Sequence, residues 1–133
     1  MLTNSISAEL HDRERERNVS YHEHSDLQYG RNLKEAAPAA FQAYTELGTA
    51  ALRGEGNPID AKHATLVALA VALTTQCVYC IETHSKEAAN AGATEQEIAQ
   101  TTMIVAAVRA GGGVGHGLLA TKFYTEAKDR SAS

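Results

Sequence analysis

Hydrophobic residues recur every three to four positions in two stretches of the first half of the chain, and this spacing predicts helices with one buried face. The first stretch follows Pro38, which suits the first turn of a helix because its missing N–H costs nothing there. Its apolar stripe consists of Phe41, Tyr44, Leu47, Ala51 and Leu52. The stripe of the second stretch consists of Leu66, Leu69, Ala70 and Leu73. Between the stripes, residues 53–58 contain glycine and proline and predict a break, after which Asp60 suits an N-cap.

Residues 77–91 predict a third helix. It is expected to stop at Gly92, because glycine readily adopts the left-handed conformation found at helix ends. Thr94 and Glu97 then have the spacing of a capping box, in which each side chain accepts a hydrogen bond from the other residue's backbone. A fourth helix is therefore expected over residues 95–109.

The C-terminal part of the chain is expected to be interrupted. Residues 111–113 are three consecutive glycines, and we expect them to end the preceding helix. Residues 118–127 are then expected to form a last, separate helix. No stretch shows the strict alternation of apolar and polar residues that is typical of a β-strand. The predicted fold class is all-α.

Two regions differ in composition. Residues 1–30 are polar, with a run of alternating charges over residues 11–17, and are predicted to form an N-terminal arm. Residues 31–133 carry the apolar stripes and are predicted to form one helical domain. The chain has many apolar helix faces but few aromatic side chains with which to cover them. A single copy therefore has little means of burying these faces, which predicts a homo-oligomer.

Composition narrows the class of protein. The chain has 133 residues, enough for a single core, and a net charge of −4, which argues against a nucleic-acid binder. The N-terminus lacks the apolar segment of a signal peptide, and the longest apolar run, residues 66–73, is too short to span a membrane. We therefore expect a cytoplasmic protein that binds neither nucleic acid nor a membrane.

Cys77, Cys80 and His84 form the main chemical candidate. Their spacing of i, i+3 and i+7 places all three on one stripe if the segment is helical. In a reducing compartment a permanent structural disulfide is disfavoured. Redox chemistry or metal binding is therefore the better interpretation of the two cysteines. Near a helix N-terminus the Cys77 thiolate would be stabilised by the helix dipole, and His84 could exchange a proton with Cys80. The pattern predicts a redox-active dithiol.

Two other interpretations of the cysteines stay open. Both could be small buried hydrophobic residues. A structural zinc ion needs four ligands, and the second pair that is typical of zinc fingers is missing. His116, His22 or His24 would have to complete such a site from a distance, so no metal is expected.

Residues 62–117 resemble the carboxymuconolactone decarboxylase superfamily, and more closely its alkyl hydroperoxidase D-like branch. The resemblance rests on Cys-x-x-Cys-x-x-x-His, the following Ala-Gly-Ala and an alanine-rich segment that ends in Gly-Gly. The founding decarboxylase branch lacks the cysteine pair. The resemblance implies an all-helical domain that assembles into trimers or hexamers. It also implies a thiol peroxidase that uses no metal, haem or flavin and takes electrons from a protein dithiol or a lipoamide-like thiol.

The resemblance also implies roles for the three residues. Cys80 would attack the hydroperoxide, Cys77 would resolve the oxidised product, and His84 would belong to the proton relay. This order differs from the helix-dipole argument, which favours Cys77 as the more stable thiolate.

One position departs from the pattern that the resemblance implies. The family has a relay Glu twelve residues before the first cysteine, and this chain has Thr65. Either Glu82 or another acidic residue substitutes for it, or the peroxidase activity is weak. Thr65 could instead bond its own helix backbone, and Glu82 could be a solvated charge. Tyr79, where some relatives have histidine, and His116 are further candidates for the relay or the pocket, although His116 could equally be a packed structural residue.

Two other functions are consistent with the sequence. A lactone decarboxylase or related isomerase would use His84 or His116 as its acid or base. A non-enzymatic oligomer could instead sense oxidation through the Cys77–Cys80 pair and alter a contact with a partner.

Overall fold

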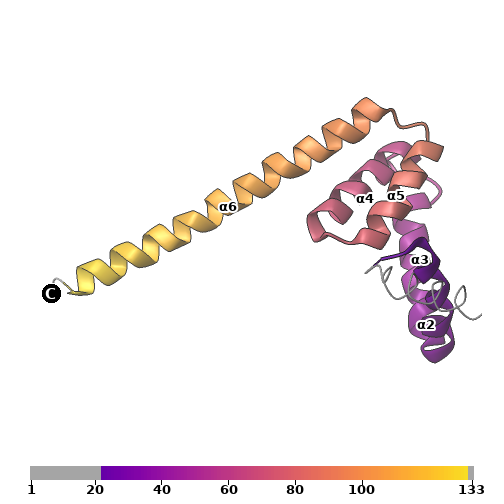
Figure 1. The fold of residues 1–133 in the computed structure, drawn as a ribbon, viewed down its shortest axis with the longest axis horizontal. Coiled ribbons are helices and arrows are strands. Elements are labelled where there is room, and N and C mark those ends of the chain that lie inside the picture. The colour runs from indigo at the N-terminus through magenta and orange to yellow at the C-terminus, as the bar shows by residue number, and fades with distance from the viewer. Residues whose placement is uncertain (1–21, 132–133) are drawn as a thin grey trace, which may run out of the picture. The chain divides into compact units, whose positions relative to one another are not determined.

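The computed structural model describes residues 22–131, and its regular structure within them is entirely helical. The prediction of an all-α fold is therefore confirmed. One 3-10 helix precedes five α-helices, coloured in chain order from indigo to yellow in Figure 1. They are η1 (His24–Tyr29), α2 (Gly30–Ala36), α3 (Pro38–Arg53), α4 (Ala61–Thr75), α5 (Val78–Asn90) and α6 (Glu95–Ser131).

The chain divides into two compact units, Met1–Pro38 and Ala39–Ser133. In the first unit η1 contacts α2. The start of η1 carries a capping box, in which the Glu23 N–H donates to Asp26 Oδ2 at 2.9 Å. The predicted arm falls largely on residues 1–21, which lie outside the described residues. The division into residues 1–30 and 31–133 stays a prediction.

Local signals correctly predicted the starts of α3 and α4. α3 begins at Pro38, and α4 begins after Asp60, whose carboxylate accepts a hydrogen bond from the His63 N–H at 3.1 Å. That hydrogen bond lowers the pKa of Asp60. In the loop between the helices, the Asn57 side chain donates to the Ala50 carbonyl at 2.9 Å and so ties the loop back to α3. The signals at Pro38 and Asp60 act within a few residues, which is why the sequence could indicate them.

The core of the second unit lies where α4 packs against α5 and α6. Leu69 is 2% exposed, and burying a leucine stabilises the fold by about 1.5–3 kcal/mol. The other buried residues are small, which lets the helix backbones approach closely. They are Ala64 and Ala72 on α4, Ala88 on α5 and Val105 on α6.

The turn between α5 and α6 also follows its predicted signals. Gly92 has φ +80°, the left-handed conformation expected at a helix end. The Thr94 N–H donates to Glu97 Oε2 at 2.7 Å, and the Glu97 N–H donates to Thr94 Oγ1 at 3.2 Å. The capping box is thus confirmed, and α6 begins at Glu95.

The predicted interruption at residues 111–113 is wrong. α6 continues through these glycines to Ser131, so residues 118–127 belong to α6 and do not form a separate helix. Each glycine weakens a helix by about 1 kcal/mol relative to alanine, but it can still adopt the right-handed conformation. None of the three glycines has a positive φ, and no proline follows Pro58 in the sequence. Alanine and arginine precede the run, and leucine and alanine follow Gly117, so the helix continues across the glycine-rich residues between them.

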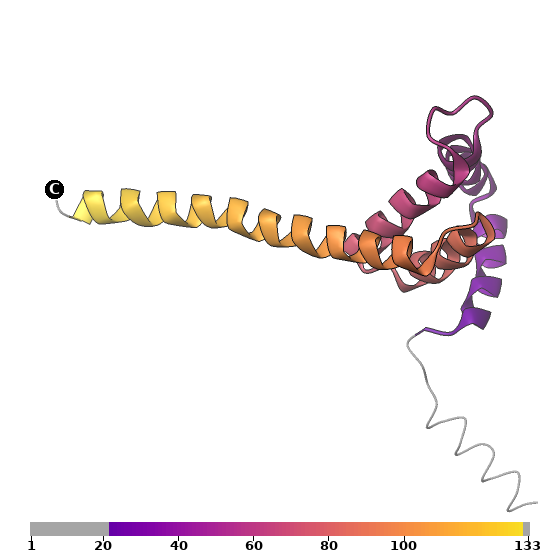
Figure 2. The same ribbon diagram turned by 90° about the horizontal axis from the view of Figure 1, so that it is seen from above.

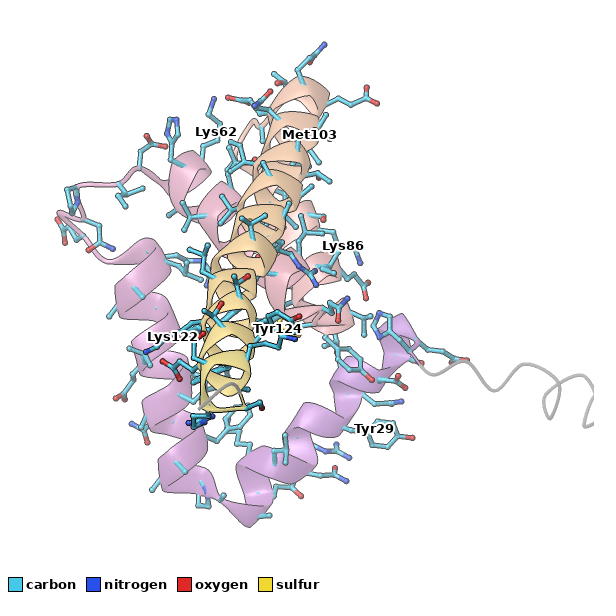
Figure 3. All side chains as sticks on the ribbon, turned by 90° about the vertical axis from the view of Figure 1, so that its left-hand side faces the viewer. Tyr29, Lys62, Lys86, Met103, Lys122 and Tyr124 are labelled. Atoms are coloured by element: carbon cyan, nitrogen blue, oxygen red, sulfur yellow. A yellow bond between two sulfur atoms is a disulfide. The ribbon has the colours of Figure 1, made fainter. Side chains whose placement is uncertain are left out.

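α6 has two parts with different environments. Its first turns, up to Val105, pack against α4, whereas residues 106–131 are exposed. Figures 1 and 2 both show this second part extending away from α4 and α5. Apolar side chains such as Leu118 and Tyr124 stand on its surface, and Figure 3 labels Tyr124 and, nearer the start of the helix, Met103.

α6 is relevant to the prediction that the protein does not bind a membrane. Among the described residues it is the one helix that is long and apolar enough to cross a membrane, judged by length and composition alone. It contains no long unbroken apolar run, because glycine and threonine interrupt its hydrophobic residues. Core helices of soluble proteins share this length and composition but are mostly buried, whereas 6% of the apolar window of α6 is buried. The cytoplasmic location stays a prediction.

Candidate functional site

Cys77 and Cys80 occupy the start of α5. Gln76 ends α4 in a left-handed conformation, with φ 56°, and turns the chain at that point. Cys77 is the N-cap of α5, and Cys80 lies in the first turn. The two cysteines are joined in a disulfide, with their Cα atoms 5.2 Å apart. The Cys80 N–H donates to Cys77 Sγ at 3.3 Å.

This geometry corrects the prediction of a single helical stripe. Cys77 has φ −82° and ψ 99°, which is extended backbone, so it does not share a helical face with His84. Cys80 and His84 are four residues apart within α5 and do lie on one face. Cys77 lies at the helix N-terminus, as the sequence predicted, where the dipole stabilises negative charge on sulfur.

Cys80 and His84 line an open, mostly apolar pocket of about 290 Å³ between α4, α5 and the end of α3. Its other lining residues are Leu52, Ala64, Val67, Ala68, Val71, Ala72 and Thr75. Cys77 does not line this pocket. A small apolar molecule in the pocket would therefore contact Cys80.

His84 is held by a carboxylate on its own helix. Its Nδ1 lies 2.9 Å from Glu87 Oε2, and the two side chains are 19% and 27% exposed. The other oxygen of the same carboxylate, Oε1, is paired with Nη2 of Arg53, the last residue of α3. Glu87 thus links His84 on α5 to the end of α3.

Glu87 and Arg53 were not among the predicted site residues. His-x-x-Glu at i, i+3 is a spacing at which helical side chains meet, and this signal was present. The contact with Arg53 joins residues 34 positions apart, and no local pattern indicates it.

Thr65 bonds its own helix, as one of the two interpretations predicted. Its hydroxyl donates to the Ala61 carbonyl at 2.8 Å. Thr65 also lines a second pocket, of about 300 Å³, whose polar lining includes Arg53, Glu87 and Asn90. The resemblance implies a carboxylate at position 65, which Thr65 occupies. Thr65 and Glu87, the carboxylate that pairs with His84, therefore line the same pocket.

The remaining candidates lie elsewhere. Glu82 Oε1 accepts a hydrogen bond from Lys86 Nζ at 2.5 Å, one turn along α5. Tyr79 is half-buried in the first turn of α5. His116 lies on the exposed part of α6, and it does not line the pocket around Cys80. Roles for these three residues in a relay or a pocket stay predictions.

A second ion pair joins α4, which lines the pocket, to α6. Lys62 Nζ, in the first turn of α4, lies 2.7 Å from Glu97 Oε1, in the first turn of α6. The hydrogen bond from Lys62 lowers the pKa of Glu97 to about 2, and the same bond raises the pKa of Lys62. Over residues 22–131, no group of three or more His, Cys, Asp or Glu side chains is arranged to hold a metal ion.

Comparison with known proteins gives one family. Residues 38–123 match the sequence model of the carboxymuconolactone decarboxylase family. A crystal structure of an apo carboxymuconolactone decarboxylase family protein from Legionella pneumophila is similar to this chain, with a TM-score of 0.58 and 25% identity. The similarity covers 63% of this chain and 74% of the Legionella chain.

Two curated relatives match shorter stretches. An uncharacterized protein of Haemophilus influenzae is 55% identical over 51 residues, which are 38% of this chain and 43% of the relative. The uncharacterized protein 4 in the cox locus of Paracoccus denitrificans is 41% identical over 58 residues, which are 44% of this chain and 52% of the relative. The chain thus matches about half the length of these relatives.

Proposed function

This chain belongs to the carboxymuconolactone decarboxylase family, and within it we propose a thiol-dependent peroxidase of the alkyl hydroperoxidase D-like branch. One observation carries the proposal. The Cys77–Cys80 disulfide lies at the start of α5, one helical turn before His84, and Cys80 and His84 line an apolar pocket that is open to solvent. The reduced pair would supply the two electrons that reduce one hydroperoxide to an alcohol and water.

In the first step the Cys80 thiolate attacks the terminal oxygen of the hydroperoxide. A sulfur–oxygen bond forms, the O–O bond breaks, and Cys80 becomes a sulfenic acid. His84 accepts the Cys80 thiol proton beforehand and returns it to the departing alkoxide, which leaves as the alcohol. The apolar lining of the pocket suits an organic hydroperoxide with a small hydrocarbon body.

In the second step the Cys77 sulfur attacks the sulfenic acid of Cys80. The disulfide forms, and the sulfenic oxygen leaves with two protons as water. A protein dithiol or a lipoamide-like thiol then attacks Cys80 and is itself oxidised to a disulfide, which returns both cysteines to the reduced form. Cys77 is the leaving group in that exchange, and its place at the N-cap stabilises the departing thiolate. The helix dipole can therefore stabilise the thiolate of Cys77 while Cys80 is the residue that attacks the hydroperoxide.

The assembly state and the location are part of the proposal. We expect a cytoplasmic homo-oligomer, a trimer or a hexamer. The exposed apolar side chains of α6 support the oligomer, because a soluble monomer seldom leaves so many of them in water. A monomeric mass by light scattering at micromolar concentration would contradict it.

The test is hydroperoxide consumption with a dithiol reductant. Cys80→Ser should lower the rate by at least roughly 10²-fold, because no other group in the pocket can attack the peroxide. Cys77→Ser should also stop turnover, but only after Cys80 has been oxidised once. Equal rates for both variants and the wild type would refute the peroxidase.

A lactone decarboxylase is the second candidate function. The observation that favours it is the His84–Glu87 pair, an acid–base pair at the pocket that needs neither cysteine. Two results together would support this function and exclude the first. The Cys77→Ser, Cys80→Ser double variant would decarboxylate a lactone, and the wild type would consume no peroxide.

A further inference from the structure

We infer that Glu87 is the positioning residue for His84, holding the imidazole in the tautomer that can accept the proton of Cys80. The catalytic consequence of this inference rests on the proposed function. The arrangement itself rests on two contacts of one carboxylate.

The first contact fixes the tautomer. Glu87 Oε2 lies 2.9 Å from His84 Nδ1, and a carboxylate only accepts hydrogen bonds, so Nδ1 carries the proton. The other ring nitrogen, Nε2, then has its lone pair free to act as a base. An unpaired imidazole would divide between two tautomers and two ring orientations.

The second contact fixes the carboxylate. Arg53 pairs with Glu87 Oε1, so both oxygens of the carboxylate are engaged and its rotamer is defined. Arg53 is 60% exposed, and an ion pair that open to water contributes little to stability. Its expected effect is therefore on orientation.

Glu82 provides the natural comparison. It lies on the same helix, two residues before His84, and its carboxylate is bonded to Lys86. Residues two positions apart point to different sides of a helix, whereas residues three apart are neighbours. Glu87, and not Glu82, can therefore orient the imidazole.

The competing explanation is a surface pair that merely stabilises α5. An i, i+3 pair of this kind contributes about 0.2–0.5 kcal/mol to a helix. That explanation predicts a slightly lower melting temperature for Glu87→Ala and no change in the chemistry of Cys80 in the folded protein.

The test measures the reactivity of the Cys80 thiol directly. In a Cys77→Ser background Cys80 is the single thiol, since the chain has two cysteines, and serine is itself a good N-cap. The rate of iodoacetamide alkylation at pH 7 is compared for His84→Ala, Glu87→Ala and the variant with both changes. If Glu87 acts through His84, Glu87→Ala slows alkylation about tenfold, as when a metal-bound histidine loses its orienting carboxylate. The same change should have no further effect once His84 is gone.

Two controls make the outcome specific. Glu46→Ala removes an exposed carboxylate on α3 that lines neither pocket, and it should leave the alkylation rate unchanged. Glu87→Gln keeps the shape and a hydrogen-bond acceptor, and it should restore most of the rate lost in Glu87→Ala. The inference is overturned if Glu87→Ala has no effect on the rate, or if it slows alkylation equally with and without His84.

The alkylation test is independent of the peroxidase assay. If the wild type consumes no hydroperoxide but the two substitutions are coupled, the proposed function fails and the inference on Glu87 stands. If peroxide is consumed but the substitutions are not coupled, the reverse holds. In the active enzyme, the positioning role predicts that Glu87→Ala lowers kcat and leaves KM unchanged.

Discussion

The two parts of α6 share one helix and a similar content of apolar residues, yet they have different environments. The first part contacts α4, buries Val105 and anchors Glu97 on Lys62. The second part, residues 106–131, is exposed along its whole length. The difference shows that burial in this chain is determined by what a helix packs against and not by how apolar it is.

The chemistry of the site follows the same division. Cys80, His84 and Glu87 all lie on α5, which packs against α4. The packed region can hold side chains in the fixed geometry that proton transfer requires. The exposed part of α6 offers apolar surface, and we have proposed that other copies of the chain cover it.

The largest expected effect comes from shortening a leucine in each region. Leu69→Ala removes a side chain that is 2% exposed and should lower the free energy of unfolding by about 2–5 kcal/mol at every protein concentration. Leu118→Ala removes one that is 69% exposed, and in the most dilute samples it should cost less than about 0.5 kcal/mol. Urea unfolding over a range of protein concentrations measures both. Equal losses at all concentrations would mean that the two regions do not differ.

A glycine substitution in each region gives the next effect. A Cβ added at Gly112 would meet nothing within 4 Å in this chain, so Gly112→Ala should stabilise α6 by up to about 1 kcal/mol. Gly92 has φ +80°, a conformation that costs alanine about 1–2 kcal/mol, so Gly92→Ala should destabilise the protein. Thermal unfolding followed by far-UV circular dichroism measures both changes. A lower melting temperature for Gly112→Ala would indicate a break in α6 or a close neighbour at that point.

The smallest effect concerns pH. The pKa of Glu97 is lowered from 4.5 to about 2, so its contribution to stability is fully present above pH 4.5 and is lost as the pH falls toward 2. The raised pKa of Lys62 adds a contribution that is present below pH 10.5 and lost as the pH rises beyond it. Both side chains are about one third exposed, so water screens the pair and the effect is modest.

Glu97→Gln isolates this effect, because the amide oxygen can still accept the hydrogen bond from the Thr94 N–H. The difference in melting temperature between the wild type and Glu97→Gln should be constant between pH 4.5 and 10.5 and should shrink below that window. A difference that grows on acidification would contradict the assignment.

Much of the fold could be predicted because its signals are local. The signals that begin or end helices act within one turn of the backbone, and each does so as expected. They are Pro38, Asp60, Gly92 and the Thr94–Glu97 pair. The glycine run at residues 111–113 was misjudged because a low intrinsic propensity lowers the stability of a helix without ending it.

The site was predicted less completely. Spacing located Cys77, Cys80 and His84, and Cys77 lies at the start of a helix as predicted, but spacing could not show that its backbone is extended. It also could not indicate Glu87 as the partner of His84, because the contact that orients the carboxylate comes from Arg53, 34 positions earlier. Contacts of that kind arise from the packing of distant segments.

Exposure of the reduced Cys77→Ser variant to one equivalent of an organic hydroperoxide tests the central claim most directly. Intact and peptide mass spectrometry then follow the product, with a dimedone-type reagent added to trap a sulfenic acid. The proposed mechanism predicts one added oxygen atom on Cys80, its capture by the reagent, and slower formation when His84 is replaced by alanine. An unmodified Cys80 after the peroxide has been given time to react would contradict the claim that this dithiol reduces hydroperoxides.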